Sequence, residues 1–220
     1  MQQYTRQPLT IQQLKSEAAA FARLTSGQSE PALFGVTDGK AVGTYLEQKF
    51  QDYLSRKYRY AKGSSTAGLD FPELKVDIKV TSLRQPQSSC PFQSARQKIY
   101  GLGYSLLVFV YEKSDDADSR TGRLDIRHTI FVEASRTADF QTSSGLCAIL
   151  DNDANRDDIL AFFSERMLPV DDIQAQMLAD EVLQRRPEIG YLTISNALQW
   201  RLQYSRVIQQ AGQIAGIDAL

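Results

Sequence analysis

A continuous apolar run near the middle of the chain, from Ser105 to Tyr111, constrains the fold more than any other feature. A strand of this composition is typical of a position covered on both faces, so we expect it at the centre of a sheet. An acidic, glycine-containing turn at 113–122 separates it from a second predicted strand, Leu124–Glu133, and the two can form a long hairpin. The core should therefore be built around this pair.

Helical spacing predicts elements on both sides of these strands. Gln12–Leu24 is amphipathic, and in Ala41–Tyr58 apolar residues recur every four positions, as on one buried stripe. A short helix is expected over Ser94–Gly103. Beyond about residue 151 the predicted elements are all helices, over Asn155–Met167, Asp171–Arg186 and Ser195–Gly212. We expect a single domain over 1–220, with an α/β core at 1–150 and a helical C-terminal subdomain at 151–220.

Composition excludes several classes of protein. The 220 residues carry a formal net charge of −1, so any nucleic-acid surface must be local. Two cysteines cannot form a dense disulfide framework, and a single histidine counts against histidine-based nuclease chemistry. The longest apolar run is too short to cross a bilayer, and no secretion signal stands at the N-terminus. We therefore expect a cytoplasmic protein without a membrane partner.

The residues with the clearest chemical potential lie on a predicted strand, Leu74–Ser82, in which polar and apolar residues alternate. Two-residue periodicity places Asp77 and Lys79 on the same face. Asp70 lies seven residues before Asp77 and two before a proline, where a short turn can return its carboxylate beside Asp77. Magnesium prefers one or two carboxylates with waters and phosphate oxygens, and the Ile78 carbonyl can complete the protein ligands.

Lys79 and Glu47 extend this hypothesis. An ammonium next to the metal can orient or help deprotonate the attacking water and offset charge that develops on phosphorus. Glu47 shares a helix face with Gly43 and Phe50, which is unusual for a solvated glutamate, so it can act as a metal ligand or an orienting group. A lone Asp-x-Lys pair usually lies on a solvated face. Only its combination with Asp70 and Glu47 favours phosphodiester hydrolysis.

The spacing of these residues resembles that of the PD-(D/E)xK nucleases, in the branch of the mismatch-repair nicking endonuclease MutH and its restriction-enzyme relatives. The similar segments are Lys40, Gly43 and Glu47 on a helix, Asp-Phe-Pro-Glu-Leu at 70–74, and Val-Asp-Ile-Lys-Val-Thr at 76–81. An aspartate stands at position 77, where the family's strand usually has a glutamate. The match covers residues 40–82, and no close match to MutH extends beyond it.

The resemblance implies a PD-(D/E)xK restriction-endonuclease-like α/β fold, with a mixed β-sheet flanked by helices. It implies a type II restriction endonuclease that hydrolyses double-stranded DNA at a specific short sequence with Mg²⁺, in the same system as a cognate DNA methyltransferase. The implied catalytic residues are Glu47, Asp70, Asp77 and Lys79, and the implied metal ligands are Asp70, Asp77, Ile78 and Glu47. A homodimer and paired nicking by monomers both fit a palindromic site. A DNA-repair nicking endonuclease of the MutH type and a non-catalytic DNA-binding module stay as alternatives.

Two segments are candidates for DNA contacts. The polar segment after the predicted strand carries groups suited to base edges and phosphates, namely Arg84, Gln85, Gln87, Ser88, Arg96 and Lys98. It can equally be an ordinary polar loop that leads into a helix. The predicted helix Ser195–Gly212 is compatible with helix-turn-helix DNA recognition, although an amphipathic helix packed on a core is the commoner case. Neither segment identifies a recognition sequence.

Overall fold

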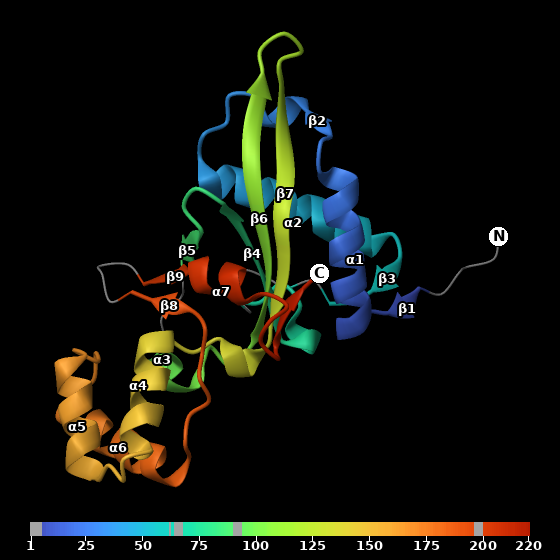
Figure 1. Cartoon of the computed structure of the whole chain (residues 1–220). Coiled ribbons are helices and arrows are strands. Elements are labelled where there is room, and N and C mark those ends of the chain that lie inside the picture. Colours follow the sequence, from blue (N-terminus) through green and yellow to red (C-terminus); the bar gives the residue numbers. More distant parts are fainter. Residues whose placement is uncertain (1–5, 62, 64–67, 90–93, 196–199) are drawn as a thin grey trace. The chain divides into compact units, whose positions relative to one another are not determined.

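In the computed structural model of the protein, residues 6–61, 63, 68–89, 94–195 and 200–220 are described. They form two compact units whose segments alternate along the chain (Figure 1). Unit 1 contains Met1–Gln87, Leu106–Phe131 and Ala211–Leu220, and unit 2 contains Ser88–Ser105 and Val132–Gln210. The chain therefore enters and leaves each unit more than once.

Unit 1 is an α/β structure built on a mixed sheet of strand order β10-β7-β6-β4. The strands are β4 (Val76–Ser82), β6 (Ser105–Asp116), β7 (Thr121–Val132) and β10 (Ile217–Ala219), and β2 (Ser29–Glu30) pairs antiparallel with β7. The long strands β6 and β7 are hydrogen-bonded neighbours joined by a short loop, which confirms the predicted hairpin (Figure 1). From Leu106 to Tyr111 each side chain is at most 5% exposed, so β6 is covered on both faces, as its composition predicts.

Helices α1 (Ile11–Thr25) and α2 (Gly39–Ser55) pack against each other, and α2 packs against β4. Each helix begins at a side-chain cap: Thr10 forms a capping box before α1, and the Asp38 carboxylate accepts from the Lys40 N–H at the start of α2. The residues that repeat every four positions in α2 are all buried, namely Val42, Leu46, Phe50 and Leu54. The predicted stripe is therefore the face by which α2 enters the core.

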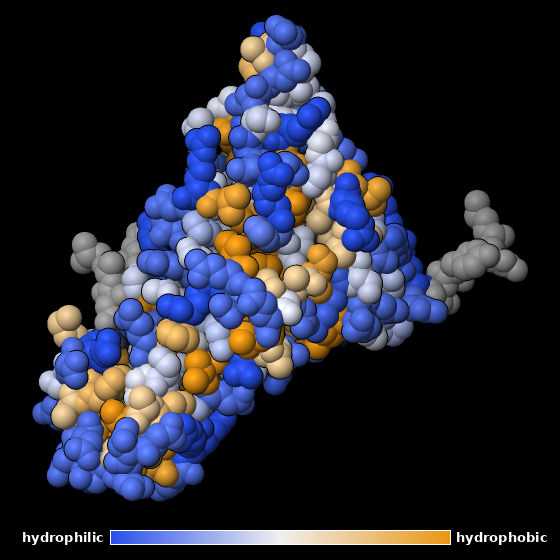
Figure 2. All heavy atoms as spheres, in the orientation of Figure 1, coloured by the Kyte–Doolittle hydropathy of each residue, from blue (hydrophilic) through white to orange (hydrophobic). Residues whose placement is uncertain are grey.

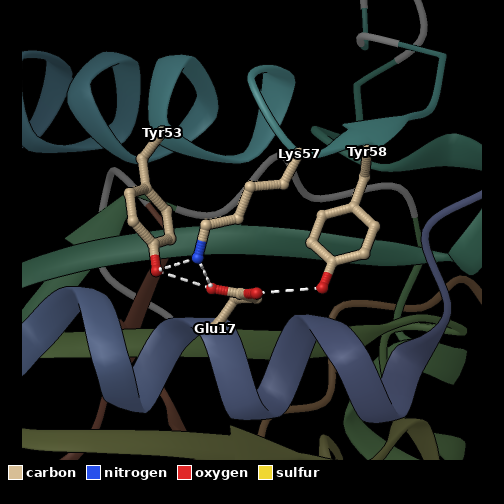
Figure 3. A network of polar contacts seen from close by, with 4 residues as sticks. All are labelled: Glu17, Tyr53, Lys57 and Tyr58. Carbon is tan, nitrogen blue, oxygen red and sulfur yellow. Dashed lines mark hydrogen bonds and ion pairs between the residues drawn. The ribbon is translucent and has the colours of Figure 1, made fainter. Parts of the chain in front are cut away.

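A polar network ties α1 to the C-terminal end of α2 (Figure 3). The Glu17 carboxylate accepts hydrogen bonds from Tyr53 Oη at 2.6 Å, Lys57 Nζ at 2.7 Å and Tyr58 Oη at 2.9 Å. Burial raises the pKa of Glu17, but these donors outweigh it and lower the pKa below its ordinary value. Tyr58 also belongs to β3 (Tyr58–Arg59), which pairs in parallel with β1 (Gln7–Pro8). The network thus joins α1 to the end of α2.

Unit 2 contains most of the remaining helices and a small sheet of order β5-β9-β8. Its elements are α3 (Arg96–Tyr100), α4 (Phe140–Leu150), α5 (Arg156–Glu165), α6 (Asp172–Gln184), α7 (Ser205–Gln210), β5 (Gln87–Ser89), β8 (Thr193–Ile194) and β9 (Arg201–Gln203). Apolar side chains from α3 to α6 form a core cluster of their own, which includes Ile99, Leu146 and Phe163. Apolar residues also reach the surface, as Figure 2 shows, and Met167 and Ile173 are more than two-thirds exposed.

The predicted helix Ser195–Gly212 is wrong for much of its length. Residues 196–199 lie outside the described residues, Arg201–Gln203 forms β9, and α7 begins only at Ser205. Leu202 and Tyr204 are fully buried with a two-residue period, and Leu202 pairs with Ile194 of β8. Because the described part of this region lacks one long helix, the helix-turn-helix interpretation loses its support.

The division of the chain also differs from the boundary predicted near residue 151. Unit 2 begins at Ser88 and includes α3 and α4, while β10 returns the C-terminus to the sheet of unit 1. The C-terminal region is not purely helical, since β8, β9 and β10 belong to it. Within the described ranges, none of the helices combines the length and apolarity needed to cross a lipid bilayer.

Candidate active site

β4 carries two of the predicted site residues side by side. Asp77 and Lys79 share a face of the strand, and Lys79 Nζ lies 2.7 Å from Asp77 Oδ2. Val76 and Ile78, on the opposite parity, are buried in the core of unit 1. Asp77 itself is only 6% exposed. The alternation of the sequence thus anchors the strand by one face and holds a partly buried ion pair on the other.

A tight chain reversal brings Asp70 to the same place. Phe71 and Val76 exchange backbone hydrogen bonds of 3.0 and 3.2 Å around the short helical turn η2 (Pro72–Leu74). Lys75 closes this turn with a φ of 52°, in the left-handed region. The reversal lets Asp70 Oδ2 accept a hydrogen bond from the Ile78 N–H at 2.8 Å. Asp70 therefore lies beside the strand that carries the ion pair.

The electrostatics of Asp70 differ from those of a solvated aspartate. Burial, a hydrogen bond with the Asp77 carboxyl group, and the negative fields of Asp77 and Glu47 raise its pKa to about 7. The Ile78 N–H acts in the opposite direction, because it stabilises the carboxylate. At neutral pH the metal-free site therefore holds less negative charge than its carboxyl groups would carry in water. A cation among these groups would favour their ionised forms.

Glu47 reaches this centre from α2. The helix approaches the strand closely one turn earlier, where a Cβ added to Gly43 would lie 3.8 Å from the Val80 Cβ. Burial raises the pKa of Glu47, the ammonium of Lys79 lowers it, and the carboxylate of Asp77 raises it again. These couplings indicate that Glu47 interacts with both members of the β4 pair. The structure thus brings together Glu47, Asp70, Asp77 and Lys79.

Gln51 also belongs to this group, although no sequence pattern singled it out. Its Nε2 donates to Asp70 Oδ1 at 2.9 Å, so both oxygens of Asp70 are engaged. Gln51 lies one turn after Glu47 on α2, and residues four apart on a helix share a face. This spacing could have marked Gln51, once Glu47 was placed toward the strand.

The donor set fits a hard divalent cation that keeps several waters. Among the described residues, no group of three or more His, Cys, Asp or Glu side chains is arranged as a metal site. Magnesium needs only one or two carboxylates, which Asp70 and Asp77 supply. The Ile78 N–H points toward Asp70, and in an extended strand the carbonyl of a residue points to the same edge as its N–H. Its carbonyl oxygen is therefore a plausible third donor on that side.

The predicted DNA-contacting residues fall into two groups. Arg84 and Gln85 are exposed on the turn that follows β4, where the Arg84 N–H donates to the Ser82 hydroxyl at 3.2 Å. Gln87 and Ser88 lie in β5 and are half-buried. Of these four residues, only Arg84 and Gln85 present their side chains openly to solvent.

Arg96 and Lys98, on α3, already have interaction partners within the protein. The Arg96 guanidinium pairs with the Glu181 carboxylate, with Nη2 2.6 Å from Oε1 and Nε 3.0 Å from Oε2. Lys98 is 6% exposed, its ammonium lies 5.6 Å from the centre of the Trp200 ring, and burial lowers its pKa. A DNA contact by Lys98 would require its side chain to move, whereas Arg96, whose side chain is 45% exposed, would share its guanidinium between Glu181 and the DNA.

Comparisons with known proteins agree on one family. Residues 8–219 match the family described as type II restriction enzyme NspV. A type II restriction enzyme NspV from Nostoc sp. (strain ATCC 29411 / PCC 7524) is 62% identical over 209 residues, which cover 95% of this chain and 95% of that protein. No solved structure matches the chain.

Proposed function

The chain belongs to the NspV family of type II restriction enzymes, and on that premise we propose that Asp70, Asp77 and Lys79 form the centre at which it hydrolyses double-stranded DNA with Mg²⁺. Family membership makes the protein an endodeoxyribonuclease of a restriction-modification system. The site and its cofactor are argued from geometry. The observation that carries them is the partly buried Asp77–Lys79 pair with Asp70 returned beside it.

Asp70 and Asp77 are the residues that would hold Mg²⁺, together with the Ile78 carbonyl. Two carboxyl groups that share a hydrogen bond in a buried place repel each other when both are ionised, and a divalent cation relieves this repulsion. When bound, Mg²⁺ supplies a Lewis acid that polarises the phosphate and lowers the pKa of its water. Glu47 is the third carboxylate, placed to hold a further cation or to orient Lys79.

Lys79 is the residue proposed to act on the reacting atoms. Its ammonium can hold the attacking water by a hydrogen bond and offset the negative charge that develops on the phosphoryl oxygens. The oxygen of the water then forms a bond to phosphorus as the bond between phosphorus and the leaving oxygen breaks; the attacking water loses a proton to solvent, and the leaving oxygen takes one up from solvent. Asp77, at 2.7 Å, keeps the ammonium from turning away. The buried setting strengthens both interactions, because the local dielectric constant is low.

The motif resemblance and the family assignment support compatible mechanisms. We propose that the site is of the PD-(D/E)xK type, since its carboxylates and lysine stand at that spacing on a strand and the turn before it. Membership in a type II family favours cleavage at a specific short sequence over repair nicking of the MutH type. The presence of Asp70, Asp77 and Lys79 together also disfavours a non-catalytic DNA-binding module.

DNA recognition and assembly are proposed on the same basis. Arg84 and Gln85 can reach a phosphate or a base edge from the exposed turn after β4, while the strand itself carries the chemistry. A palindromic target would be cut by a two-fold homodimer or by paired nicking, because each site cuts one strand. A cognate DNA methyltransferase would protect the host's own copies of the target.

The test is cleavage of unmethylated phage DNA with and without Mg²⁺, by the wild type and by Lys79→Ala. Lys113→Ala is a matched control, since Lys113 also pairs with an aspartate, Asp115, on a strand of the same sheet. Discrete Mg²⁺-dependent fragments with the wild type and the control, and none with Lys79→Ala, would support the proposal. Cleavage that Lys79→Ala leaves unchanged would refute this active site.

A further inference from the structure

Both oxygens of Asp70 accept a hydrogen bond, and the two donors come from different elements. Oδ2 accepts from the Ile78 N–H of β4 at 2.8 Å, and Oδ1 accepts from Gln51 Nε2 of α2 at 2.9 Å. Two donors at fixed positions define the plane of a carboxylate, since one contact alone would let it rotate about the Cβ–Cγ bond. The second lone pairs of these oxygens remain for the Asp77 carboxyl group, with which Asp70 shares a hydrogen bond, and for a cation.

Gln51 is itself held by a second contact. Tyr60 Oη donates to the backbone carbonyl of Gln51 at 2.8 Å, and the Tyr60 ring lies 5.2 Å from that of Phe71, the residue after Asp70. Phe71 is 1% exposed and belongs to the core of unit 1. Tyr60 therefore links the part of α2 that carries Gln51 to the turn that carries Asp70. Tyr60 thereby ties the backbone from which the Gln51 side chain extends to the residue next to Asp70.

We propose that Gln51 is a positioning residue, which orients the Asp70 carboxylate for the divalent cation. Tyr60 holds the backbone of Gln51 beside the turn that carries Asp70. The proposal rests on the proposed function, because it assumes that Asp70 is a metal ligand. One turn of α2 would then serve the centre twice, through Glu47 toward the β4 pair and through Gln51 toward Asp70. Partners of ligand carboxylates commonly control metal affinity in this way.

The chemistry of an amide suits this position better than that of a charged side chain. A lysine would form an ion pair with Asp70 and compete with the cation for it. A glutamate would add a further negative charge beside Asp70, Asp77 and Glu47. The neutral Gln51 amide donates a hydrogen bond while leaving the charge of the carboxylate to the metal.

The experiment compares Gln51→Met with Gln48→Met in the full-length protein. Methionine approximates the length of glutamine without its donor, and Gln48 is an exposed glutamine on the same helix, so the control makes the same change away from the site. Ca²⁺ binding to the protein–DNA complex, measured by calorimetry, reads the metal site directly. The Mg²⁺ concentration at half-maximal cleavage and the thermal unfolding midpoint are measured in parallel.

We expect Gln51→Met to weaken Ca²⁺ binding and to raise the half-maximal Mg²⁺ concentration by about 10- to 100-fold. Gln48→Met should stay within about twofold of the wild type, because its side chain faces solvent. Tyr60→Phe should shift both readouts in the same direction by a smaller factor, and it provides a second variant should Gln51→Met fail to fold. Unchanged metal affinity in a folded Gln51→Met would overturn the proposal.

Asp70→Asn separates this inference from the proposed function. Loss of cleavage in Asp70→Asn, together with normal metal dependence in Gln51→Met, would reject only the role of Gln51. Normal cleavage by Asp70→Asn would instead reject the active site itself.

Discussion

Two aspartates, the half-buried Asp70 in unit 1 and the buried Asp139 in unit 2, have opposite surroundings. Asp139 is 4% exposed and accepts hydrogen bonds from the Thr142 N–H at 2.9 Å, the Thr142 hydroxyl at 2.7 Å and the Ile194 N–H at 2.8 Å. Asp70 accepts hydrogen bonds too, but it also faces two further carboxyl groups, one of which is that of Asp77. One carboxylate is surrounded by donors, and the other stands among groups of its own charge.

The difference separates a structural carboxylate from the one proposed to bind the metal. Asp139 caps α4 and connects its N-terminus to β8, so groups that stay in place balance its charge. Around Asp70 the carboxyl groups outnumber the compensating cation, Lys79, and the balance depends on protons or on a metal. Buried acids that repel each other are therefore the better sign of a reactive centre. Four predictions test this contrast.

The largest expected effect is on the rate of cleavage. Asp77→Asn removes one of the two carboxylates proposed to hold Mg²⁺, and we expect the single-turnover rate to fall by about 10²- to 10³-fold. Asp139→Asn retains an oxygen acceptor at the helix cap, so cleavage per folded molecule should be close to that of the wild type. Similar losses in the two variants would remove the functional distinction between the regions.

The second effect is on stability, and here a change at Asp139 is expected to have the large effect. Asp139→Ala leaves the Thr142 and Ile194 N–H groups without their acceptor in a buried place, and the free energy of unfolding should fall by about 3 kcal/mol. Urea denaturation of the metal-free protein measures it. Asp118→Ala, at the exposed turn between β6 and β7, is the control and should change stability by less than about 0.5 kcal/mol. A loss equal to that of the control would show that Asp139 is not structural.

The third effect depends on pH. Because the pKa of Asp70 is raised from 3.8 to about 7 in the folded protein, its contribution to stability is full below about pH 4 and is lost as the pH rises through 7. Asp70→Asn should therefore stabilise the metal-free protein relative to the wild type above pH 7, by on the order of 2 kcal/mol. Unfolding in a chelator at pH 5 and pH 8 tests this. A difference that is the same at both values would contradict it.

The smallest effect concerns the network of Figure 3, which resembles the surroundings of Asp139 more than those of Asp70. Glu17→Gln keeps an acceptor for the two tyrosines but loses the ion pair with Lys57, whose side chain is 45% exposed. We expect the free energy of unfolding to fall by less than about 1 kcal/mol. Thermal unfolding at neutral pH measures it, with Glu165→Gln on the exposed end of α5 as the control. Lost cleavage activity in Glu17→Gln would contradict a purely structural role.

Much of the site could be predicted from periodicity and spacing. The alternation in β4 placed Asp77 and Lys79 together, and the four-residue repeat in α2 identified its buried stripe. Gln51 was missed because its partner, Asp70, is distant along the chain and lies on a turn. Arg96 illustrates the same limit, since nothing in its own segment indicates that Glu181 of α6 engages its guanidinium.

The sequence by itself determined the local elements and the polarity of their faces, because side-chain alternation and helical repeats follow directly from backbone geometry. It also determined the spacing of the carboxylates and the lysine of the proposed site. Only the tertiary structure decided which donors meet Asp70, that β9 replaces part of a predicted helix, and that the two units alternate along the chain. These features depend on contacts between residues far apart in sequence, whose free energy comes from burying surfaces together and is not encoded in any short segment.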